Sequence, residues 1–289
     1  MWDEYFSPKS VREVLEILQS YKGQARIIAG GTDLIPEIKG QIRKVKCLVD
    51  ISEIDLLKKI EIDGDTIKIG AGITHSEVAA SELIREQAMV LAEAASAVGS
   101  PLIRNQGTVV GNVVNAQPAA DTAVALFALG AEIEIVSQRA TKIVPIEKLY
   151  KGVGLSKIDS TMEMATAVYF KSLKNNQGSA FVRLAQRKAL TLPILNAAVV
   201  VTAQKDRFSE ARVVVAPVAP RPLRSKKAEA ILTDAPISPE YINKAAEAVA
   251  FEAQPRESAL RGSAEYRMEM VKVLLVRALR LAIQRVKEK

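Results

Sequence analysis

The segment that most constrains this chain is residues 103–121, a run of small and polar residues with neither helical nor strand periodicity. Glycines at 107 and 111 stand on either side of a threonine, so backbone N–H groups there can face a ligand with no side chain in the way. A hydroxyl, an amide and a carboxylate then follow at intervals that suit one long polyhydroxylated ligand: Thr108, Asn112 and Asp121. The alternative, a buried turn, stays open on this stretch alone.

A second candidate site is the turn Gly30-Gly31-Thr32-Asp33, which follows an apolar segment at 25–29 and precedes residues with helical spacing. A strand that runs into a helix start leaves unpaired N–H groups, and two glycines allow a diphosphate to rest against the backbone. The pattern is neither a Walker loop nor a Rossmann fingerprint. Taken alone, it is more often a tight turn with a side-chain cap, and both interpretations stay open.

Composition excludes several classes of function. Hydrophobic residues make up 48% and charged residues 25% of 289, which is typical of a globular protein. No apolar run approaches the roughly 20 residues of a membrane span, and the N-terminus lacks the pattern of a secretory signal, so we expect a cytoplasmic protein. With one cysteine, Cys47, and one histidine, His75, the chain cannot by itself form a disulfide, hold an iron–sulfur cluster or build a Cys/His zinc site.

The charge indicates the kind of partner. Lysine and arginine number 40 against 33 aspartate and glutamate, a net charge of +7, but the basic residues are spread and aromatic residues are only 4%. That content is too low for the stacking platforms of single-strand nucleic-acid binders. The excess therefore favours an acidic partner protein or an anionic ligand.

In the first half of the chain, periodicity predicts a helix over 10–20 with Ser10 and Glu13 as a capping box. Strands are expected at 25–29 and 48–51, which makes the first 55 residues a βαβ-like unit. The sequence further predicts a hairpin over 60–69, helices over 76–80 and 82–98, a helix closing at 126–129, strands at 131–136, 142–145 and 163–170, and an exposed loop at 150–154.

A second domain is expected to begin near residue 175, after a polar linker. Strands are predicted at 179–185, 195–203 and 211–216, followed by a break at 219–222 and helices over about 225–232, 239–252 and 259–287. The basic face of the last helix is interpreted as solvated, although a partner chain could use it. His75 is better interpreted as a residue at a helix start than as a catalytic one.

The two glycine-bearing stretches, in this order and about 75 residues apart, resemble the FAD-binding medium subunit of the molybdenum hydroxylases, the group of the bacterial xanthine dehydrogenases and aerobic carbon monoxide dehydrogenases. The similarity spans the whole chain. The matching residues are Ala29-Gly30-Gly31-Thr32-Asp33-Leu34, Ile103-Arg104-Asn105, Thr108, Gly111-Asn112, Pro118, Asp121, Phe181, Arg187-Lys188-Ala189, Ala219-Pro220, Pro222, Arg224 and Arg261 to Arg267.

The resemblance implies an α+β fold: an FAD-binding domain of the vanillyl-alcohol-oxidase (PCMH) type over 1–174, in subdomains of about 1–55 and 56–174, and over 175–289 a C-terminal antiparallel sheet with helices. It implies that one turn wraps the FAD diphosphate: Ile28, Ala29, Gly30, Gly31, Thr32, Asp33 and Leu34. Thr108, Gly111 and Asn112 match positions at the phosphates, and Asp121 matches the carboxylate that takes ribityl hydroxyls.

The chain departs from the family pattern at three positions. Val110 replaces the first of two glycines before the asparagine, which is costly if that position needs a positive φ. Some relatives have a lysine where this chain has Val182 and an aspartate where it has Thr191, so the chain departs from those relatives near the flavin ring. The cysteines of the iron–sulfur insertion found in one subgroup are missing.

By this resemblance the chain is the flavin relay of a three-subunit oxidoreductase. A molybdopterin-binding large subunit and a 2Fe-2S small subunit are the implied partners, and electrons leave FAD for NAD or another acceptor. No catalytic side chain and no metal ligand are expected on this chain. Two alternatives remain: a self-contained FAD oxidase of the same fold, and a non-catalytic assembly subunit that has lost FAD.

Overall fold

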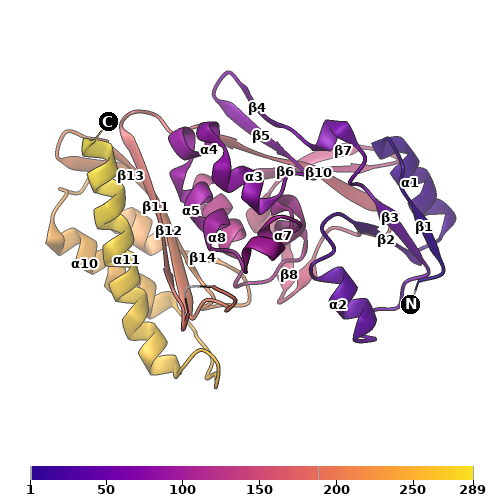
Figure 1. Cartoon of the computed structure of the whole chain (residues 1–289). Helices are drawn as coiled ribbons and strands as arrows, with labels where there is room; N and C mark the ends of the chain where they lie inside the picture. The colour runs from indigo at the N-terminus through magenta and orange to yellow at the C-terminus, as the bar shows by residue number, and fades with distance from the viewer. Residues whose placement is uncertain (1, 188, 289) are drawn as a thin grey trace.

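The computed structural model describes residues 2–187 and 189–288, so Lys188 of the family resemblance lies outside the described residues. Within these residues the chain forms four β-sheets, with helices between and outside them (Figure 1). The strands are β1 Glu4–Phe6, β2 Ala25–Ile28, β3 Cys47–Asp50, β4 Ile60–Asp63, β5 Thr66–Gly70, β6 Glu132–Ser137, β7 Thr141–Pro145, β8 Tyr150–Gly152, β9 Leu155–Ser156, β10 Glu163–Lys171, β11 Gln177–Leu184, β12 Leu195–Gln204, β13 Arg207–Ala216 and β14 Leu223–Arg224.

The helices pack between and outside these sheets. They are α1 Val11–Ser20, α2 Leu34–Lys39, α3 His75–Ala80, α4 Glu82–Gln87, α5 Met89–Ala97, α6 Pro101–Arg104, α7 Val109–Val114, α8 Asp121–Leu129, α9 Lys226–Leu232, α10 Pro239–Glu252 and α11 Ala264–Lys287, with short 3-10 turns at Asp55–Leu57 and Ile146–Lys148. Within the described ranges, no helix is both long and apolar enough to cross a membrane.

The N-terminal sheet confirms the predicted βαβ-like unit. Its strands run parallel in the order β1-β3-β2, and β1 was not predicted because its three residues are all exposed and carry no alternation. Helix α1 begins where the sequence indicates, since the Ser10 hydroxyl accepts from the backbone N–H of Glu13 at 3.2 Å. The Glu13 carboxylate accepts a hydrogen bond from the backbone N–H of Lys9 rather than from that of Ser10.

The second sheet has the order β4-β5-β10-β6-β7 and is antiparallel throughout, which confirms the 60–69 hairpin and the strands of residues 131–170. The predicted helix over 82–98 is wrong in one respect, because Ala88 leaves the helical conformation and separates α4 from α5. Helix α5 is apolar on nearly every side and lies between α8 and β11, a position that a straight continuation of α4 would not reach.

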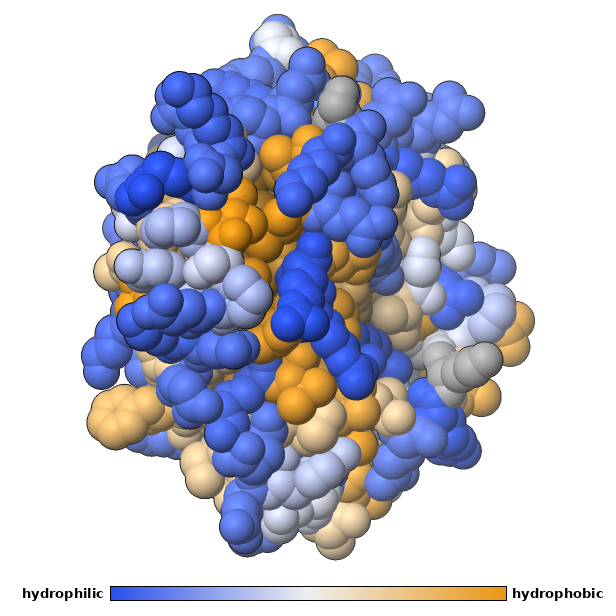
Figure 2. Space-filling view, turned by 90° about the vertical axis from the view of Figure 1, so that its left-hand side faces the viewer, coloured by the Kyte–Doolittle hydropathy of each residue, from blue (hydrophilic) through white to orange (hydrophobic). Residues whose placement is uncertain are grey.

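The third sheet, β11-β12-β13-β14, is covered on both faces (Figure 1). Helices α9 and α11 pack on one face and α10 packs outside them, while α5 and α8 pack on the other. Phe181, Ala198, Val200 and Val214 belong to the same buried cluster as the N-terminal part of the chain. This cluster therefore joins one face of the sheet to the rest of the molecule, while the opposite face packs with the C-terminal helices in a second buried cluster. Figure 2 views the side of α10 and α11, where a strip of hydrophobic residues shows between hydrophilic ones.

Two further sequence predictions are corrected. Residues 150–154 are only in part the predicted exposed loop: Lys151 and Val153 are exposed, but Tyr150 is buried with its ring 5.4 Å from that of Phe127, and β8 pairs with β9. This contact joins residues far apart in sequence, which local patterning cannot reveal. The last helix begins at Ala264 rather than 259, because Gly262 has φ +83° and the Ser263 hydroxyl caps the first turn by accepting from Tyr266 N.

Candidate functional site

The glycine turn predicted from sequence connects β2 to α2. Gly31 has φ +65°, a conformation that glycine adopts without strain. Among the described residues, no hydrogen bond satisfies the backbone N–H groups of residues 30–33. Asp33 precedes α2 but its side chain makes no capping hydrogen bond; burial and then Glu37 raise the pKa of its carboxyl group, against the lowering effect of the Asn115 side chain. The turn therefore presents a row of unpaired donors, as an anion site requires.

The polar stretch at 103–121 is partly helical, which its sequence did not predict. Thr108 caps α7: its Oγ accepts from the backbone N–H of Gly111 at 3.0 Å. The backbone on either side is fixed to the segment after β5, since His75 N donates to Gly107 O at 3.0 Å and Val109 N donates to Ile73 O at 3.1 Å. Backbone hydrogen bonds to residues 73 and 75 therefore fix the position of the loop around Thr108.

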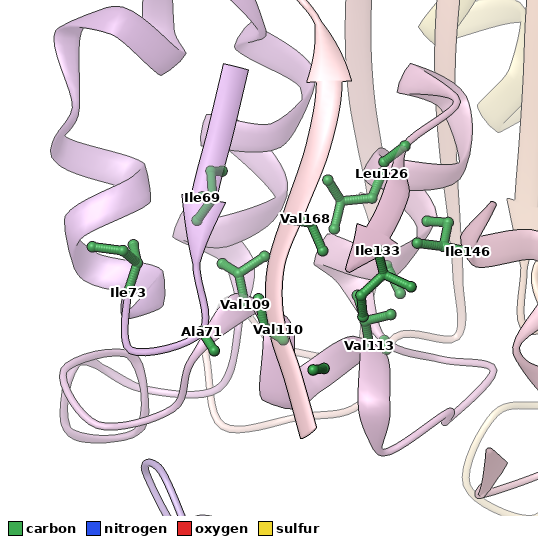
Figure 3. Packing of buried hydrophobic residues seen from close by; sticks show 14 of the residues in the cluster. Ile69, Ala71, Ile73, Val109, Val110, Val113, Leu126, Ile133, Ile146 and Val168 are labelled. Carbon is green, nitrogen blue, oxygen red and sulfur yellow. The ribbon is translucent and has the colours of Figure 1, made fainter. Parts of the chain in front are cut away.

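Val110 has a structural explanation. It lies inside α7, has no positive φ and is 2% exposed, and it packs beside Val109 and Val113 against the strands of the second sheet (Figure 3). The β-branched side chain therefore carries no backbone penalty, and it contributes to the core instead. The concern raised by the missing glycine does not apply to this loop.

The two loops are in direct backbone contact. A Cβ built on Gly30 would lie 1.9 Å from the carbonyl oxygen of Gln106 and 2.9 Å from Cα of Gly107. A side chain at residue 30 is excluded, because backbone atoms cannot move aside as a flexible side chain could. Segments about 75 residues apart in sequence thus form one surface, as the paired motifs predict.

Asn112 and Asp121 follow on the same side of the cleft. The Asn112 side-chain oxygen accepts from the hydroxyl of Thr122 at 2.7 Å, which orients the remaining amide NH₂. Asp121 is the first residue of α8 and is 6% exposed; its carboxylate accepts from Asn196 Nδ2 at 2.7 Å and lies 3.3 Å from Arg183 Nε. Burial raises the pKa of Asp121 to about 6, against the lowering effect of Arg183 and Asn196.

All of the site residues predicted from sequence line a single cleft of about 1020 Å³: Ile28, Ala29, Gly30, Gly31, Thr32, Asp33, Leu34, Thr108, Gly111, Asn112 and Asp121. This volume is at the upper end of the roughly 300–1,000 Å³ of small-molecule sites and suits a long ligand. Arg26, Arg43 and several residues between 154 and 165 also line the cleft. The C-terminal part contributes Arg183, residues 190–193 and Arg261 to the same lining.

Sequence reasoning missed several polar residues of this cleft. Asn115 and Gln117 stand in the polar stretch itself and could have been found there, since they continue its run of amides. Arg183 carried no local signal, because it belongs to an ordinary-looking strand, whereas Arg261 stands among the residues of the family resemblance but was not assigned to the site. Their place in the cleft depends on how the third sheet packs against α8.

His75 also reaches the cleft wall. It is the first residue of α3, as the sequence indicates, and Thr74 with Glu77 forms the capping box. The imidazole is 2% exposed and its Nδ1 has no hydrogen-bond partner within the described chain. Burial, aided by Arg104, lowers the pKa of His75 to about 4, so the ring is neutral at physiological pH. Across residues 2–187 and 189–288, no cluster of three or more His, Cys, Asp or Glu could hold a metal ion.

Comparison with known protein families gives two matches that together cover most of the chain. Residues 2–170 match the FAD binding domain in molybdopterin dehydrogenase, and residues 180–282 match the CO dehydrogenase flavoprotein C-terminal domain. Among curated proteins, the chain is 31% identical to the 6-hydroxypseudooxynicotine dehydrogenase complex subunit alpha of Paenarthrobacter nicotinovorans, over 98% of this chain and 95% of that protein.

Two further similarities cover nearly the full length. The carbon monoxide dehydrogenase medium chain of Hydrogenophaga pseudoflava is 28% identical over 96% of both chains. Among solved structures, a chain of carbon monoxide dehydrogenase from the same organism, in a form that lacks the Mo-pyranopterin moiety of the molybdenum cofactor, superposes with a TM-score of 0.94 at 28% identity, covering 99% of this chain and 98% of that one. The agreement extends through the N-terminal part and the C-terminal sheet alike.

Proposed function

The chain belongs to the family of FAD-binding medium subunits of the molybdenum hydroxylases, and from that premise we propose that it is the flavin relay of a multi-subunit oxidoreductase. FAD, when bound, supplies the conversion between single electrons from a 2Fe-2S partner subunit and an electron pair for NAD or another acceptor. The substrate would be oxidised on a molybdopterin-binding large subunit. Relatives that bear the names medium chain and complex subunit support an assembly of this kind.

The observation that carries the proposal is the fit of the cleft to a dinucleotide. Free N–H groups at residues 30–33 suit a diphosphate, and Gly30 lets the second loop pack directly against this turn so that both line one cleft. Beyond them, the Asn112 amide and the Asp121 carboxylate can meet polar groups of the linking chain, as hydroxyl donors need an acceptor. We therefore assign the FAD contacts to Ile28–Leu34, Thr108, Gly111, Asn112 and Asp121.

This arrangement assigns binding and positioning, but no proton transfer, to the chain's own residues. The unpaired backbone donors of the glycine turn would hold the phosphates, the second loop would orient the linking chain, and the C-terminal part of the lining would exclude water from the cleft. We also propose that residues 1–174 form the FAD-binding domain, with subdomains of about 1–55 and 56–174, and that residues 175–289 form a second domain closing the cleft.

Flavin content of the purified chain tests the proposal. We expect a yellow protein that binds FAD but does not oxidise substrates without partner subunits. Asp121→Ala should weaken FAD binding at least about tenfold, the loss that corresponds to one missing charge-assisted hydrogen bond. Gly31→Val should also lower the flavin bound per chain, because its side chain is strained at φ +65° and would meet Ile28 at 2.9 Å. Gly64→Val is the matched control, because Gly64 has φ +57° but stands in the open β4–β5 turn. Full FAD retention in both cleft variants would place the cofactor elsewhere.

A further inference from the structure

The carboxylate of Asp121 is contacted by two residues of the C-terminal sheet, although Asp121 itself lies on a helix outside that sheet. Asp121 opens α8, whereas its two partners, Arg183 and Asn196, stand on β11 and β12 of the C-terminal sheet. One carboxylate oxygen accepts from Asn196 Nδ2 at 2.7 Å, and the other lies 3.3 Å from Arg183 Nε. Both partners are buried or nearly so, with the Arg183 side chain 10% exposed. The contact is therefore internal, where ion pairs are poorly screened.

Arg183 reaches a third element as well. Its Nη2 donates to the backbone carbonyl of Thr191 at 2.5 Å, and Thr191, Leu192 and Pro193 line the same cleft as Asp121. A single guanidinium thus joins the start of α8, strand β11 and the segment between β11 and β12. Its planar set of donors suits this bridging role better than a lysine ammonium would.

The charge state of Asp121 depends on these neighbours. Burial raises its pKa to about 6, while the Arg183 charge and then the Asn196 hydrogen bond act in the opposite direction. Among the described residues these are the groups that act on the carboxylate. Removing the Arg183 charge leaves burial less opposed, so the pKa rises further and the carboxyl group carries a proton near neutral pH.

We propose that Arg183 is a positioning residue of the FAD site, one that holds the Asp121 carboxylate toward the ligand so that the C-terminal sheet completes a site built on the N-terminal loops. The inference rests on the proposed FAD-binding function. An ionised, fixed carboxylate accepts hydrogen bonds from ligand hydroxyls, whereas a protonated one is a poorer acceptor and loses its ion pair. Ligand binding then depends on how the C-terminal sheet is docked, although no residue of that sheet belongs to the two glycine-bearing loops.

The chain offers a matched control at the other end of the same helix. Gly130 ends α8 with φ +66°, and a Cβ built there would lie 1.5 Å from Arg212 Nη1, so the Arg212 guanidinium packs against the helix end. Arg212 stands on β13 of the same C-terminal sheet and lies outside the cleft. Arg183 and Arg212 therefore both place a guanidinium of the sheet against an end of α8, and only Arg183 lies at ion-pair distance from Asp121.

The test measures FAD dissociation constants by flavin fluorescence on the full chain, from pH 5 to 9, for wild type, Arg183→Gln, Arg183→Lys and Arg212→Gln. We expect wild-type affinity to fall as the pH drops through about 6. In Arg183→Gln the midpoint moves up by at least about one pH unit, which makes binding about twofold weaker at pH 7 and about tenfold weaker at pH 5, and affinity returns at high pH. Arg183→Lys keeps the positive charge and the wild-type midpoint, and Arg212→Gln leaves both affinity and midpoint unchanged.

A structural role alone would lower affinity without moving the midpoint, or would affect Arg212→Gln equally, and either result overturns the inference. An unchanged midpoint in Arg183→Gln would also overturn the inference. Should Arg183→Gln fail to fold, Asn196→Leu carries the test, since losing the other hydrogen-bond donor also raises the Asp121 pKa and must move the midpoint upward. If the wild-type chain binds no FAD at any pH, the proposed function itself fails, which distinguishes that outcome from a failure confined to Arg183.

Discussion

At the scale of single residues, the site depends on two glycines, which have no side chain, and on two buried titratable residues. Gly30 allows two backbone segments to touch, and Gly31 turns the chain between β2 and α2. Nearby, His75 is buried at the cleft wall as a neutral imidazole, and Asp121 is buried beside a guanidinium. Substituting these residues should change FAD binding or the stability of the chain measurably.

Gly30→Ala should separate the two loops. Its methyl group would meet the Gln106 carbonyl oxygen at 1.9 Å, so backbone must shift, and we expect destabilisation of about 1–3 kcal/mol with loss of FAD binding. Urea unfolding and flavin content measure the two effects. Gly152→Ala is the control, since a Cβ there meets only Leu155 Cδ1 at 3.6 Å. Equal flavin content in the two variants would contradict the contact between the loops.

His75 should make the stability of the apo chain depend on pH. The unfolded chain takes up a proton at His75 below about 6.5, while the folded chain does so only near 4, because burial lowers the pKa. Stability is therefore fully present above the unfolded pKa and falls as the pH drops from about 6.5 toward 4, by up to about 3 kcal/mol. The free-energy difference from His75→Gln, taken from urea unfolding at pH 7 and pH 4.5, should change by most of that amount. A constant difference would show that the ring is solvated.

At the scale of secondary-structure elements, short helices carry the polar side chains of the cleft. Helix α7 spans only Val109–Val114 and is stabilised by its cap and by three buried valines rather than by its own length (Figure 3). Helix α8 is buried along its whole length, and it presents Asp121 at one end and Gly130 at the other. The position of both helices follows from packing against the sheets on either side.

Thr108→Ala should weaken α7 by removing its cap. The lost acceptor for Gly111 N costs about 0.5–2 kcal/mol of unfolding free energy in the apo chain, and Thr108→Ser, which keeps the hydroxyl, should stay near wild type. Urea midpoints of the three proteins measure this. If the alanine and serine variants unfold at the same midpoint, the hydroxyl is not acting as a cap.

At the scale of the whole molecule, one buried cluster extends from the N-terminal sheets onto the third sheet. Polar contacts follow the same route: Glu93 of α5 accepts from Phe181 N at 2.9 Å and from Arg285 Nη1 of α11 at 3.0 Å. The interface between the two proposed domains is therefore continuous packing, and the cleft lies along one edge of it.

This continuity predicts cooperative unfolding of the apo chain. The single tryptophan, Trp2, packs near the N-terminal sheet and reports that region, whereas far-UV circular dichroism reports helices throughout the chain. We expect the two urea transitions to coincide, because neither proposed domain can lose its fold without exposing the shared core. An earlier fluorescence transition, with circular dichroism following at higher urea, would show that the parts unfold independently.

Sequence patterns predicted most elements with a strong period and an end signal, such as α1, the β4–β5 hairpin and α10. They failed where long-range packing overrides local pattern: at Ala88, where α5 turns to pass between other elements, and at Tyr150, whose ring packs on Phe127. The helical character of residues 109–114 was also missed, because valine and glycine are poor indicators of a helix and burial supplies its stability instead.

The amino-acid sequence by itself determined the two glycine-bearing loops and the family they belong to, because small residues and polar anchors at fixed spacing are local properties that survive in the linear chain. Only the tertiary structure decided that these loops touch and that Val110 lies in a helix. It also decided that Arg183 and Asn196 of the C-terminal sheet contact Asp121. The physical reason is that each of these contacts joins segments brought together by burial of apolar faces, and such faces define no unique partner until the whole core has packed.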